Sequence, residues 1–326
     1  MQLLILSRPE IESMLSMETC IELMSEALAS LARGDVILPL RPVIRVPESA
    51  DLFAVMPAYS SALSAVGAKL ISVFPGNHGT HLDSHQGVVV LFDGANGSPL
   101  ALMDAASITA IRTAAVSAVA TRVLAKSITG TLAILGSGVQ ARTHVRAMLA
   151  VRRFERVLVW SRNVDHARAL AHDVAGEGIR IEAVGDAREA VDPADVVCTV
   201  TAARDPVLSG RWLRRGTHVN AVGAALPSTR ELDSDAVTQA RLFVDRRESA
   251  LNEAGEVLIP IREGAITPEH ILGEIGEVLI GRVPGRQQDD EITLFKSLGL
   301  AVEDLACAHY LHARSARENR GVWVEI

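Results

Sequence analysis

The feature that most constrains the fold is a glycine-rich turn between an apolar strand and a helix. Thr131–Leu135 run directly into Gly136-Ser137-Gly138-Val139-Gln140-Ala141, a G-x-G-x-x-A pattern, and a helical pattern follows over Val139–Leu149. The first glycine permits a tight turn, the second lets backbone amides approach a pyrophosphate, and the small third residue lets helix and strand pack closely. With a further strand expected from Arg156, the pattern predicts a dinucleotide-binding βαβ unit whose turn contacts the cofactor.

The end of the second strand bears on which dinucleotide binds. A site that prefers NAD normally places Asp or Glu there to hold the ribose 2′-hydroxyl. Here Arg156–Trp160 is followed by Ser161, Arg162 and Asn163, none of them acidic. A hydroxyl and a guanidinium suit a 2′-phosphate, because arginine meets phosphate with paired, charged hydrogen bonds. The sequence therefore favours NADPH, with NADH as the alternative cofactor. In a competing interpretation Arg162 is a solvated residue near a helix start without a cofactor role.

Strand and helix patterns alternate through this part of the chain. We expect strands at Thr131–Leu135, Arg156–Trp160, Ile179–Ala183, Val196–Thr201, Thr217–Val222 and Leu242–Val244. Helical patterns lie between them, for example over Val139–Leu149 and Val164–Val174. Such alternation is typical of a parallel sheet covered by helices on both faces. The fold class predicted is α/β, with a Rossmann doubly wound parallel sheet.

The first hundred residues have a different pattern, rich in strands. An opening strand is followed by amphipathic helices between Glu10 and about Leu31. Strands are then expected at Arg41–Val46, Leu52–Met56, Ala68–Val73, Gly87–Asp93 and Pro99–Asp104. The last two flank a loop with Asn-Gly and predict a hairpin. An Ala-rich helix over Ile108–Leu124 follows, and an amphipathic helix over roughly Ser297–Ala316 is expected to pack back on this β-rich α+β region.

Composition excludes several classes of function. The chain has 326 residues, which fits two domains of about 150 residues each. Its 32 basic and 39 acidic residues give a net charge of −7, which argues against a protein that binds a nucleic-acid backbone. The sequence has no uninterrupted apolar run of about 18 residues and no basic leader, so we expect neither a membrane span nor a signal peptide. A cytoplasmic protein is expected.

Cysteine and histidine spacings do not predict a metal site. Cys20, Cys198 and Cys307 are odd in number and contain no CxxC pair, so neither zinc binding nor a disulfide framework is supported. His78, His81 and His85 lie near one another, but no carboxylate pattern accompanies them, and loop histidines are the commoner explanation. We expect no bound metal.

Cations in the strand-rich region are candidates for binding a small anion. Lys69 stands inside a strand pattern, where a charge is unfavourable unless it is paired. Arg112 stands in an otherwise apolar helix, and Arg41 and Arg45 flank the segment Pro42–Ile44. Each alone would more often be a surface or ion-paired residue. Beside a nicotinamide site they suggest a binding site for a carboxylate, with arginine as a bidentate grip and Lys69 as a second cation or proton donor. His85 could add a polar contact.

The chain resembles the ornithine cyclodeaminase/mu-crystallin family, and within it the ketimine reductases of the mu-crystallin type. The similarity extends over nearly the whole chain. It rests on Met56-Pro57-Ala58-Tyr59, Gly67-Ala68-Lys69, Ser84-His85-Gln86, Ile108-Thr109-Ala110-Ile111-Arg112-Thr113-Ala114-Ala115, the turn at Gly136–Ala141, Asn220-Ala221-Val222-Gly223-Ala224 and Phe295-Lys296-Ser297-Leu298-Gly299.

The resemblance implies a homodimer of two-domain subunits. The substrate-binding and dimerisation domain is expected to be discontinuous, 1–118 with 302–326, and the NAD(P)-binding Rossmann domain is expected over 119–301. The family's carboxylate-binding arginines match Arg41 and Arg112, its lysine at the substrate matches Lys69, and His85 is assigned to the substrate. Lys69 is the predicted catalytic residue. Further cofactor contacts are predicted at Thr113, Thr201, Val222, Gly223 and Ser297, besides Ser161, Arg162 and Asn163.

One position departs from the cyclodeaminase pattern. In cyclodeaminases an aspartate that activates ornithine follows the Val-Gly-Gly turn, whereas the matching position here is Ala225. The resemblance therefore implies reduction of a preformed C=N bond in a small cyclic imino acid, such as Δ1-pyrroline-2-carboxylate or Δ1-piperideine-2-carboxylate, rather than cyclodeamination. Ornithine cyclodeaminase and alanine dehydrogenase remain alternatives within the family. A protein that holds NADPH as a structural ligand without turnover is an alternative of another class.

Overall fold

The computed structural model describes residues 2–77, 80–175 and 179–326. The chain forms two compact units. Unit 1 comprises Met1–Arg112 and Gly299–Ile326, and unit 2 comprises Thr113–Leu298. These divisions fall a few residues before the boundaries expected at 118/119 and 301/302. Helix α3 (Ala105–Leu124) runs through the first division and contributes residues to both units.

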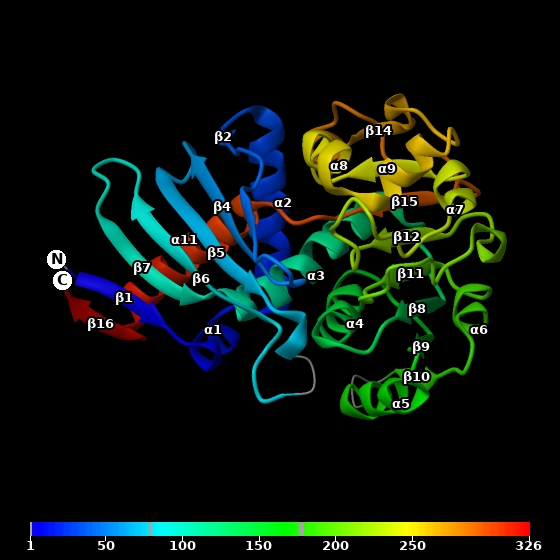
Figure 1. Cartoon of the computed structure of the whole chain (residues 1–326), viewed down its shortest axis with the longest axis horizontal. Coiled ribbons are helices and arrows are strands. Elements are labelled where there is room, and N and C mark those ends of the chain that lie inside the picture. Colours follow the sequence, from blue (N-terminus) through cyan, green and yellow to red (C-terminus); the bar gives the residue numbers. More distant parts are fainter. Residues whose placement is uncertain (1, 78–79, 176–178) are drawn as a thin grey trace. The chain divides into compact units, whose positions relative to one another are not determined.

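Unit 1 is built on a mixed sheet with the strand order β16-β1-β7-β6-β5-β4-β2, and β3 pairs with β4 (Figure 1). Its strands are β1 (Gln2–Leu6), β2 (Val36–Ile37), β3 (Val43–Arg45), β4 (Leu52–Ser60), β5 (Ala65–Val73), β6 (His85–Asp93), β7 (Pro99–Asp104) and β16 (Val322–Glu325). The predicted hairpin is confirmed, because β6 and β7 pair antiparallel. Neighbouring strands are antiparallel except β1 and β7, which are parallel.

Helices cover one face of this sheet. Unit 1 contains α1 (Arg8–Met14), α2 (Met17–Arg33) and α11 (Ala301–Glu318), and α11 lies across β4, β5, β6 and β7 (Figure 1). The strand residues that face it are buried and alternate with more exposed ones, as the two-residue period of a strand requires. The prediction that the last amphipathic helix packs back on the first region is confirmed. This face of the sheet includes Lys69, which is 2 % exposed.

Unit 2 is built on a parallel sheet with the strand order β10-β9-β8-β11-β12-β15-β13-β14. Its strands are β8 (Thr131–Leu135), β9 (Arg156–Trp160), β10 (Arg180–Ala183), β11 (Val196–Thr199), β12 (His218–Ala221), β13 (Arg241–Val244), β14 (Ile271–Glu274) and β15 (Thr293–Lys296). The strand order reverses beside β8, since β9 lies on one side of it and β11 on the other. In doubly wound sheets this switch point, at the carboxyl ends of the strands, is where ligands bind.

Helices surround the parallel sheet, as predicted. They are α4 (Val139–Val151), α5 (Val164–Asp173), α6 (Ala187–Val191), α7 (Ser234–Thr238), α8 (Arg247–Glu253), α9 (Gly255–Arg262) and α10 (Ile275–Leu279). Unit 2 also contains 3-10 turns at Gly210–Trp212 and Pro268–His270, and unit 1 contains one at Pro75–Asn77. Sequence analysis did not identify β15. Its four residues are all buried between β12 and β13, although one of them is Lys296.

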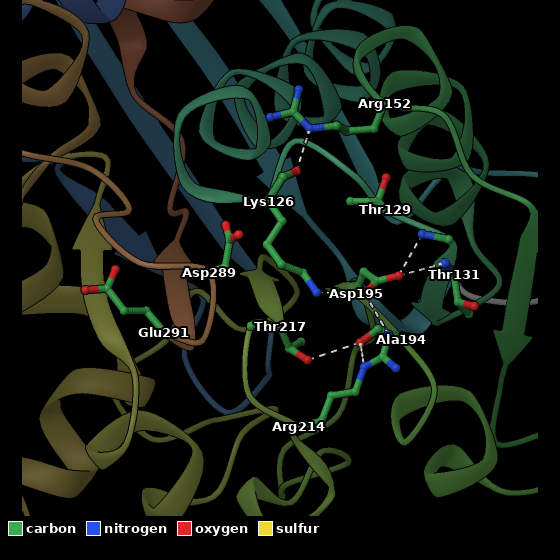
Figure 2. Close-up of polar contacts among 12 residues, drawn as sticks. Lys126, Thr129, Thr131, Arg152, Ala194, Asp195, Arg214, Thr217, Asp289 and Glu291 are labelled. Carbon is green, nitrogen blue, oxygen red and sulfur yellow. Dashed lines mark hydrogen bonds and ion pairs between the residues drawn. The ribbon is translucent and has the colours of Figure 1, made fainter.

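The amino-terminal edge of this sheet is held by a polar network around Asp195 (Figure 2). The Asp195 carboxylate accepts hydrogen bonds from the amides of Gly130 and Thr131 at 2.7 and 3.0 Å and forms ion pairs with Lys126 and Arg214. These contacts join the starts of β8 and β11. The network lies at the opposite edge from the predicted cofactor turn, and we assign it a structural role.

Helix α3 is the most apolar long helix among the described residues. Its length and composition alone would let it cross a membrane, but 72 % of its most apolar 18-residue window is buried inside the protein. Burial of that extent is typical of a core helix. Ala114, Ala115 and Ala118 on α3 are fully buried, and small side chains of this kind allow close packing.

Candidate functional site

The predicted glycine-rich turn leaves its strand at the switch point of the parallel sheet. Gly136 has φ +130°, and a Cβ there would lie 2.6 Å from the carbonyl oxygen of Val200, so a larger residue would be strained and would collide. Gly138 is the N-cap residue of α4, and no side chain caps that helix. A Cβ on Gly138 would meet nothing within 4 Å. The helix N-terminus therefore faces open space, as an approaching pyrophosphate requires.

The residues after β9 lie beside this turn. The hydroxyls of Ser137 and Ser161 are 2.9 Å apart, which joins the end of β9 to the turn. Arg162 is exposed, and its guanidinium forms no hydrogen bond or ion pair with another described residue. Asn163 accepts a hydrogen bond from the amide of Asp165 and so caps α5. Ser161 and Arg162 thus lie beside the glycine-rich turn, as the cofactor prediction requires. Asn163 also has a structural role as the N-cap of α5.

The loops at the neighbouring strand ends contain the other predicted cofactor residues of unit 2. Thr201 follows β11, Val222 and Gly223 follow β12, and Ser297 follows β15, so all four lie at the carboxyl edge. The Ser297 hydroxyl is buried and has no partner among the described residues. Thr113, the remaining predicted contact, is a buried residue of α3. An open glycine turn, an uncapped helix start and an orphaned buried hydroxyl on one sheet edge fit a bound dinucleotide.

A buried carboxylate that sequence analysis missed ties two of these loops together. Glu231 is fully buried, and it accepts hydrogen bonds from the amide and hydroxyl of Thr201 and from the amide of Gly223, at 2.6–2.7 Å. Burial and the neighbouring Glu256 carboxylate raise the pKa of Glu231, while the Thr201 hydrogen bonds and Lys296 oppose them. Lys296 in turn forms an ion pair with Glu256 at 3.1 Å. Little in the sequence signals this role, because Glu231 is followed closely by Asp233 and Asp235 and looks like one of several surface acids.

The cations predicted to bind substrate meet in unit 1. Lys69, on β5, forms an ion pair with Asp304 at 2.9 Å and donates a hydrogen bond to the Thr109 hydroxyl at 3.3 Å. Arg112, on α3, binds Glu303 at 2.8 Å and Asp304 at 3.3 Å. Lys69, Arg112 and the two acids are each at most 4 % exposed. The structure therefore brings two of the predicted residues together on a pair of carboxylates.

Arg41 lies close to the same cluster, and His85 is within range of the Lys69 charge. The Arg41 guanidinium donates a hydrogen bond to the Gly299 carbonyl at 3.3 Å, and a Cβ on Gly299 would overlap the Arg112 guanidinium. Partial burial and the Lys69 charge lower the pKa of His85, which places that imidazole within electrostatic range of the lysine. Arg45 lies exposed at the end of β3. Lys69, Arg112 and Arg41 thus lie around one point of unit 1, whereas His85 is exposed at the start of β6, four residues along the strand from Val89, which pairs with Lys69.

The electrostatics of this cluster shift the pKa values of Lys69 and Arg112 in opposite directions. Burial lowers the pKa of Lys69 to about 8, with help from the Arg112 charge and against the charges of Asp304 and Glu303. Burial would also lower the pKa of Arg112, but Asp304 and Glu303 outweigh it, and that pKa is raised. A lysine whose pKa is lowered to about 8 can donate a proton more readily than an ordinary lysine, whereas the arginine stays charged.

Sequence analysis missed the acids that hold these cations. Glu303 and Asp304 lie in the first turn of α11, where acids are common because they complement the positive end of the helix. An available signal was their position inside an otherwise apolar run, Leu300-Ala301-Val302-Glu303-Asp304-Leu305-Ala306. Two acids in such a run need cationic partners if the helix is buried on that face.

Within the described part of the chain, no group of three or more His, Cys, Asp or Glu side chains could hold a metal ion. His78, one of the histidines considered in the sequence, lies outside the described residues. The three cysteines are free, and the Sγ atoms of Cys20 and Cys307 lie 3.8 Å apart in the core of unit 1.

The sequence profile of the ornithine cyclodeaminase/mu-crystallin family matches residues 1–319. The chain belongs to this family. The resemblance drawn from its motifs is thereby confirmed, as is the predicted combination of a Rossmann-type parallel sheet with a second, strand-rich unit.

Relatives of known activity include reductases. The chain is 43 % identical over 289 residues to the ketimine reductase mu-crystallin of Mus musculus, covering 88 % of each chain. It is similar in structure to the Δ1-pyrroline-2-carboxylate reductase of Thermococcus litoralis in complex with NADH and L-proline, with a TM-score of 0.96, 40 % identity and coverage of 98 % and 99 %. An archaeal alanine dehydrogenase dimer with bound NAD matches over the full length of both chains, with a TM-score of 0.95 and 31 % identity.

Proposed function

We propose that this protein is an NAD(P)H-dependent reductase of small cyclic imino acids, converting Δ1-pyrroline-2-carboxylate to L-proline and Δ1-piperideine-2-carboxylate to L-pipecolate. The observation that carries the proposal is the cluster of Lys69, Arg112 and Arg41. In this cluster the positive charges of two arginines lie beside a lysine whose pKa is lowered by burial to about 8. A ketimine reductase and a Δ1-pyrroline-2-carboxylate reductase are among the relatives, which supports the same assignment.

The residues present suffice for such a reaction. Arg41 and Arg112 offer guanidinium groups to the substrate carboxylate, which arginine can bind with two hydrogen bonds. Bound NAD(P)H supplies the hydride that adds to the imine carbon. Lys69, acting as the catalytic residue, donates its proton to the imine nitrogen, so the C=N double bond becomes a CH–NH single bond with atoms and charge balanced. The lysine is reprotonated from solvent. The dinucleotide is held at Gly136–Ala141, with its remaining contacts at the strand ends described above.

Steady-state kinetics with the purified protein test this proposal. Both cyclic imines are supplied with NADPH and with NADH, beside ornithine with NAD and pyruvate with ammonia and NADH. We expect imine reduction to have the highest kcat/KM of the set. Faster release of ammonia from ornithine, or faster turnover of pyruvate, would overturn the proposal in favour of cyclodeaminase or alanine dehydrogenase. No cofactor oxidation with any substrate would favour a binding protein without turnover.

Cyclodeamination is disfavoured by one residue. Ala225, which matches the position of the aspartate that activates ornithine in cyclodeaminases, is exposed in the loop after β12. A methyl group cannot accept a proton from an amine. Alanine dehydrogenase activity needs no such carboxylate, and the kinetic comparison with pyruvate decides between it and imine reduction.

We further infer that NADPH is the preferred cofactor, on the basis of Ser161 and Arg162. Replacing Arg162 by Asp should weaken NADPH binding about 10- to 100-fold, because a charged hydrogen bond to phosphate of about 1.5–3 kcal/mol is lost. NADH binding should change much less. Fluorescence titration of both cofactors measures this, with Arg168→Asp, an exposed arginine further along α5, as the matched control. Equal weakening for the two cofactors would refute the phosphate contact.

A cytoplasmic homodimer formed through unit 1 is also proposed. The face of its sheet turned away from α2 and α11 is apolar and partly exposed, and it includes Phe53 and Val66, which are 37 % and 40 % exposed. Contiguous apolar surface of this kind marks association sites. The family relative described as a dimer supports the assignment.

The charge substitution Val66→Lys should therefore shift the protein from dimer to monomer. Light scattering coupled to size exclusion measures the molar mass across a dilution series. Ile128→Lys is the matched control, since Ile128 is an exposed apolar residue of unit 2. A wild-type mass of one chain at all concentrations, or an unchanged mass for Val66→Lys, would contradict this assignment.

A further inference from the structure

Two acids in the first turn of α11 form ion pairs with Lys69 and Arg112. Glu303 and Asp304 are fully buried, so their charges need direct partners. Glu303 contacts Arg112 through one carboxylate oxygen at 2.8 Å. Asp304 contacts two cations: one oxygen lies 2.9 Å from Nζ of Lys69, and the other lies 3.3 Å from Nε of Arg112. Asp304 is thus the group that joins the lysine to the arginine.

The residues just before α11 complete this arrangement. Gly299 has φ +79°, a left-handed conformation that favours glycine, and the absence of a side chain leaves room for the Arg112 guanidinium. Its carbonyl accepts the hydrogen bond from Arg41. One short segment, Gly299–Asp304, therefore contacts all three cations assigned to the substrate carboxylate and the proton transfer.

We propose that Asp304 is a positioning residue of the reaction, which fixes the Lys69 amine beside Arg112 and keeps it protonated until the imine nitrogen takes the proton. The inference rests on the proposed function and deepens it. Lys69 and Arg112 would otherwise place two positive charges side by side in a buried site, which favours loss of the lysine proton. One carboxylate between them offsets that repulsion.

The sign of the pH effect follows from the groups around Lys69. From α3, Arg112 disfavours its charged form, and the Thr109 hydroxyl accepts its hydrogen bond. From α11, Asp304 and Glu303 favour the charged form, and the charge of Lys69 reaches His85 on β6. Removing the Asp304 charge takes away a favourable interaction and lowers the pKa of Lys69 further below its present value of about 8. Without the Asp304 charge, Lys69 therefore loses its proton at a lower pH than in the wild-type protein.

The test is the pH profile of kcat/KM for the cyclic imine in Asp304→Asn and Glu303→Gln. For Asp304→Asn we expect the alkaline limb to move to lower pH by about one unit, with kcat/KM about fivefold below wild type at pH 8 and a much smaller difference at pH 6.5. Glu303→Gln, on the same helix turn and equally buried, should move the limb much less, because the Glu303 charge raises the pKa of Lys69 less than the charge and hydrogen bond of Asp304 do. Circular dichroism and cofactor titration establish that each variant is folded.

Asp304→Glu provides the second variant if Asp304→Asn does not fold. It retains the charge but lengthens the side chain, so kcat should fall while the alkaline limb stays at the wild-type pH. Equal limb shifts in Asp304→Asn and Glu303→Gln, or a shifted limb in Asp304→Glu, would overturn the inference. The proposed function fails separately, if the wild-type protein does not reduce the imines at all.

Discussion

Replacing Lys69 by Met should lower kcat/KM for the cyclic imine by about a thousandfold, within the 10²- to 10⁴-fold range typical of a lost general acid. Methionine has nearly the length of lysine but carries neither a proton nor a charge. The substrate would lose a cation of its carboxylate site as well as the donor for the imine nitrogen. The rate is measured from the absorbance of NAD(P)H at saturating cofactor, in stopped-flow or steady-state experiments.

The stability of Lys69→Met and the activity of a control variant, Lys126→Met, separate an effect on chemistry from an effect on folding. Lys69→Met leaves Asp304 with Arg112 as its remaining cation, so we expect destabilisation of up to about 3–5 kcal/mol, the range for breaking a buried ion pair. Lys126→Met removes another lysine–aspartate ion pair, at 3.2 Å, in the structural network of unit 2, and should leave the chemical step unchanged. A folded Lys69→Met variant with more than a tenth of wild-type activity would contradict the catalytic assignment.

Lys69→Arg gives a further distinction between the two roles of the lysine. Arginine keeps the positive charge but does not release a proton at these pH values. We therefore expect KM for the imine to rise less than in Lys69→Met, while kcat remains low. If Lys69→Arg restores kcat, the proton comes from water and Lys69 acts only as a cation.

The strands bounded by turn-forming residues were the easiest to predict from the sequence. The bounds of β7, β8 and β9 agree with the predicted ranges, because each is an apolar run with glycine, proline or charged residues at its ends. The strand β15 could not be found in this way. It is short and ends in Lys296, whose buried charge is compensated by Glu256 from another part of the chain. That compensation exists only in the folded structure.

The same limit applies to the site. The sequence predicted its cations, since a lysine in a strand pattern and an arginine in an apolar helix are locally unfavourable. It did not predict their partners, because Arg112 and Glu303 are separated by 191 positions. The carboxylate of Glu231, which holds two loops at the carboxyl edge of the parallel sheet, is likewise far in sequence from Thr199 and Thr201. Short-range patterns identify groups that need a partner, and tertiary structure supplies the partner.

Replacing Gly138 by Asp should nearly abolish binding of the dinucleotide without unfolding the protein. Gly138 has φ −83°, which any residue adopts, and a Cβ there would meet no atom within 4 Å, so the fold can accept the new side chain. The added carboxylate would occupy the start of α4, where a pyrophosphate is expected. Repulsion between like charges of several kcal/mol corresponds to a loss of affinity of about 100-fold or more.

Gly185→Asp is the matched control for this variant. Gly185 is also an exposed glycine of unit 2, and a Cβ on it would meet nothing within 4 Å, so the substitution adds the same charge on an equally open surface. It lies after β10 rather than at the glycine-rich turn. Calorimetric or fluorescence titration with NADH and NADPH should give wild-type affinity for Gly185→Asp and severe loss for Gly138→Asp. Similar affinities for the two variants would mean that the pyrophosphate does not lie at the start of α4. In that case the carboxylate added at position 138 would meet no negative charge of the cofactor, just as the carboxylate added at position 185 meets none.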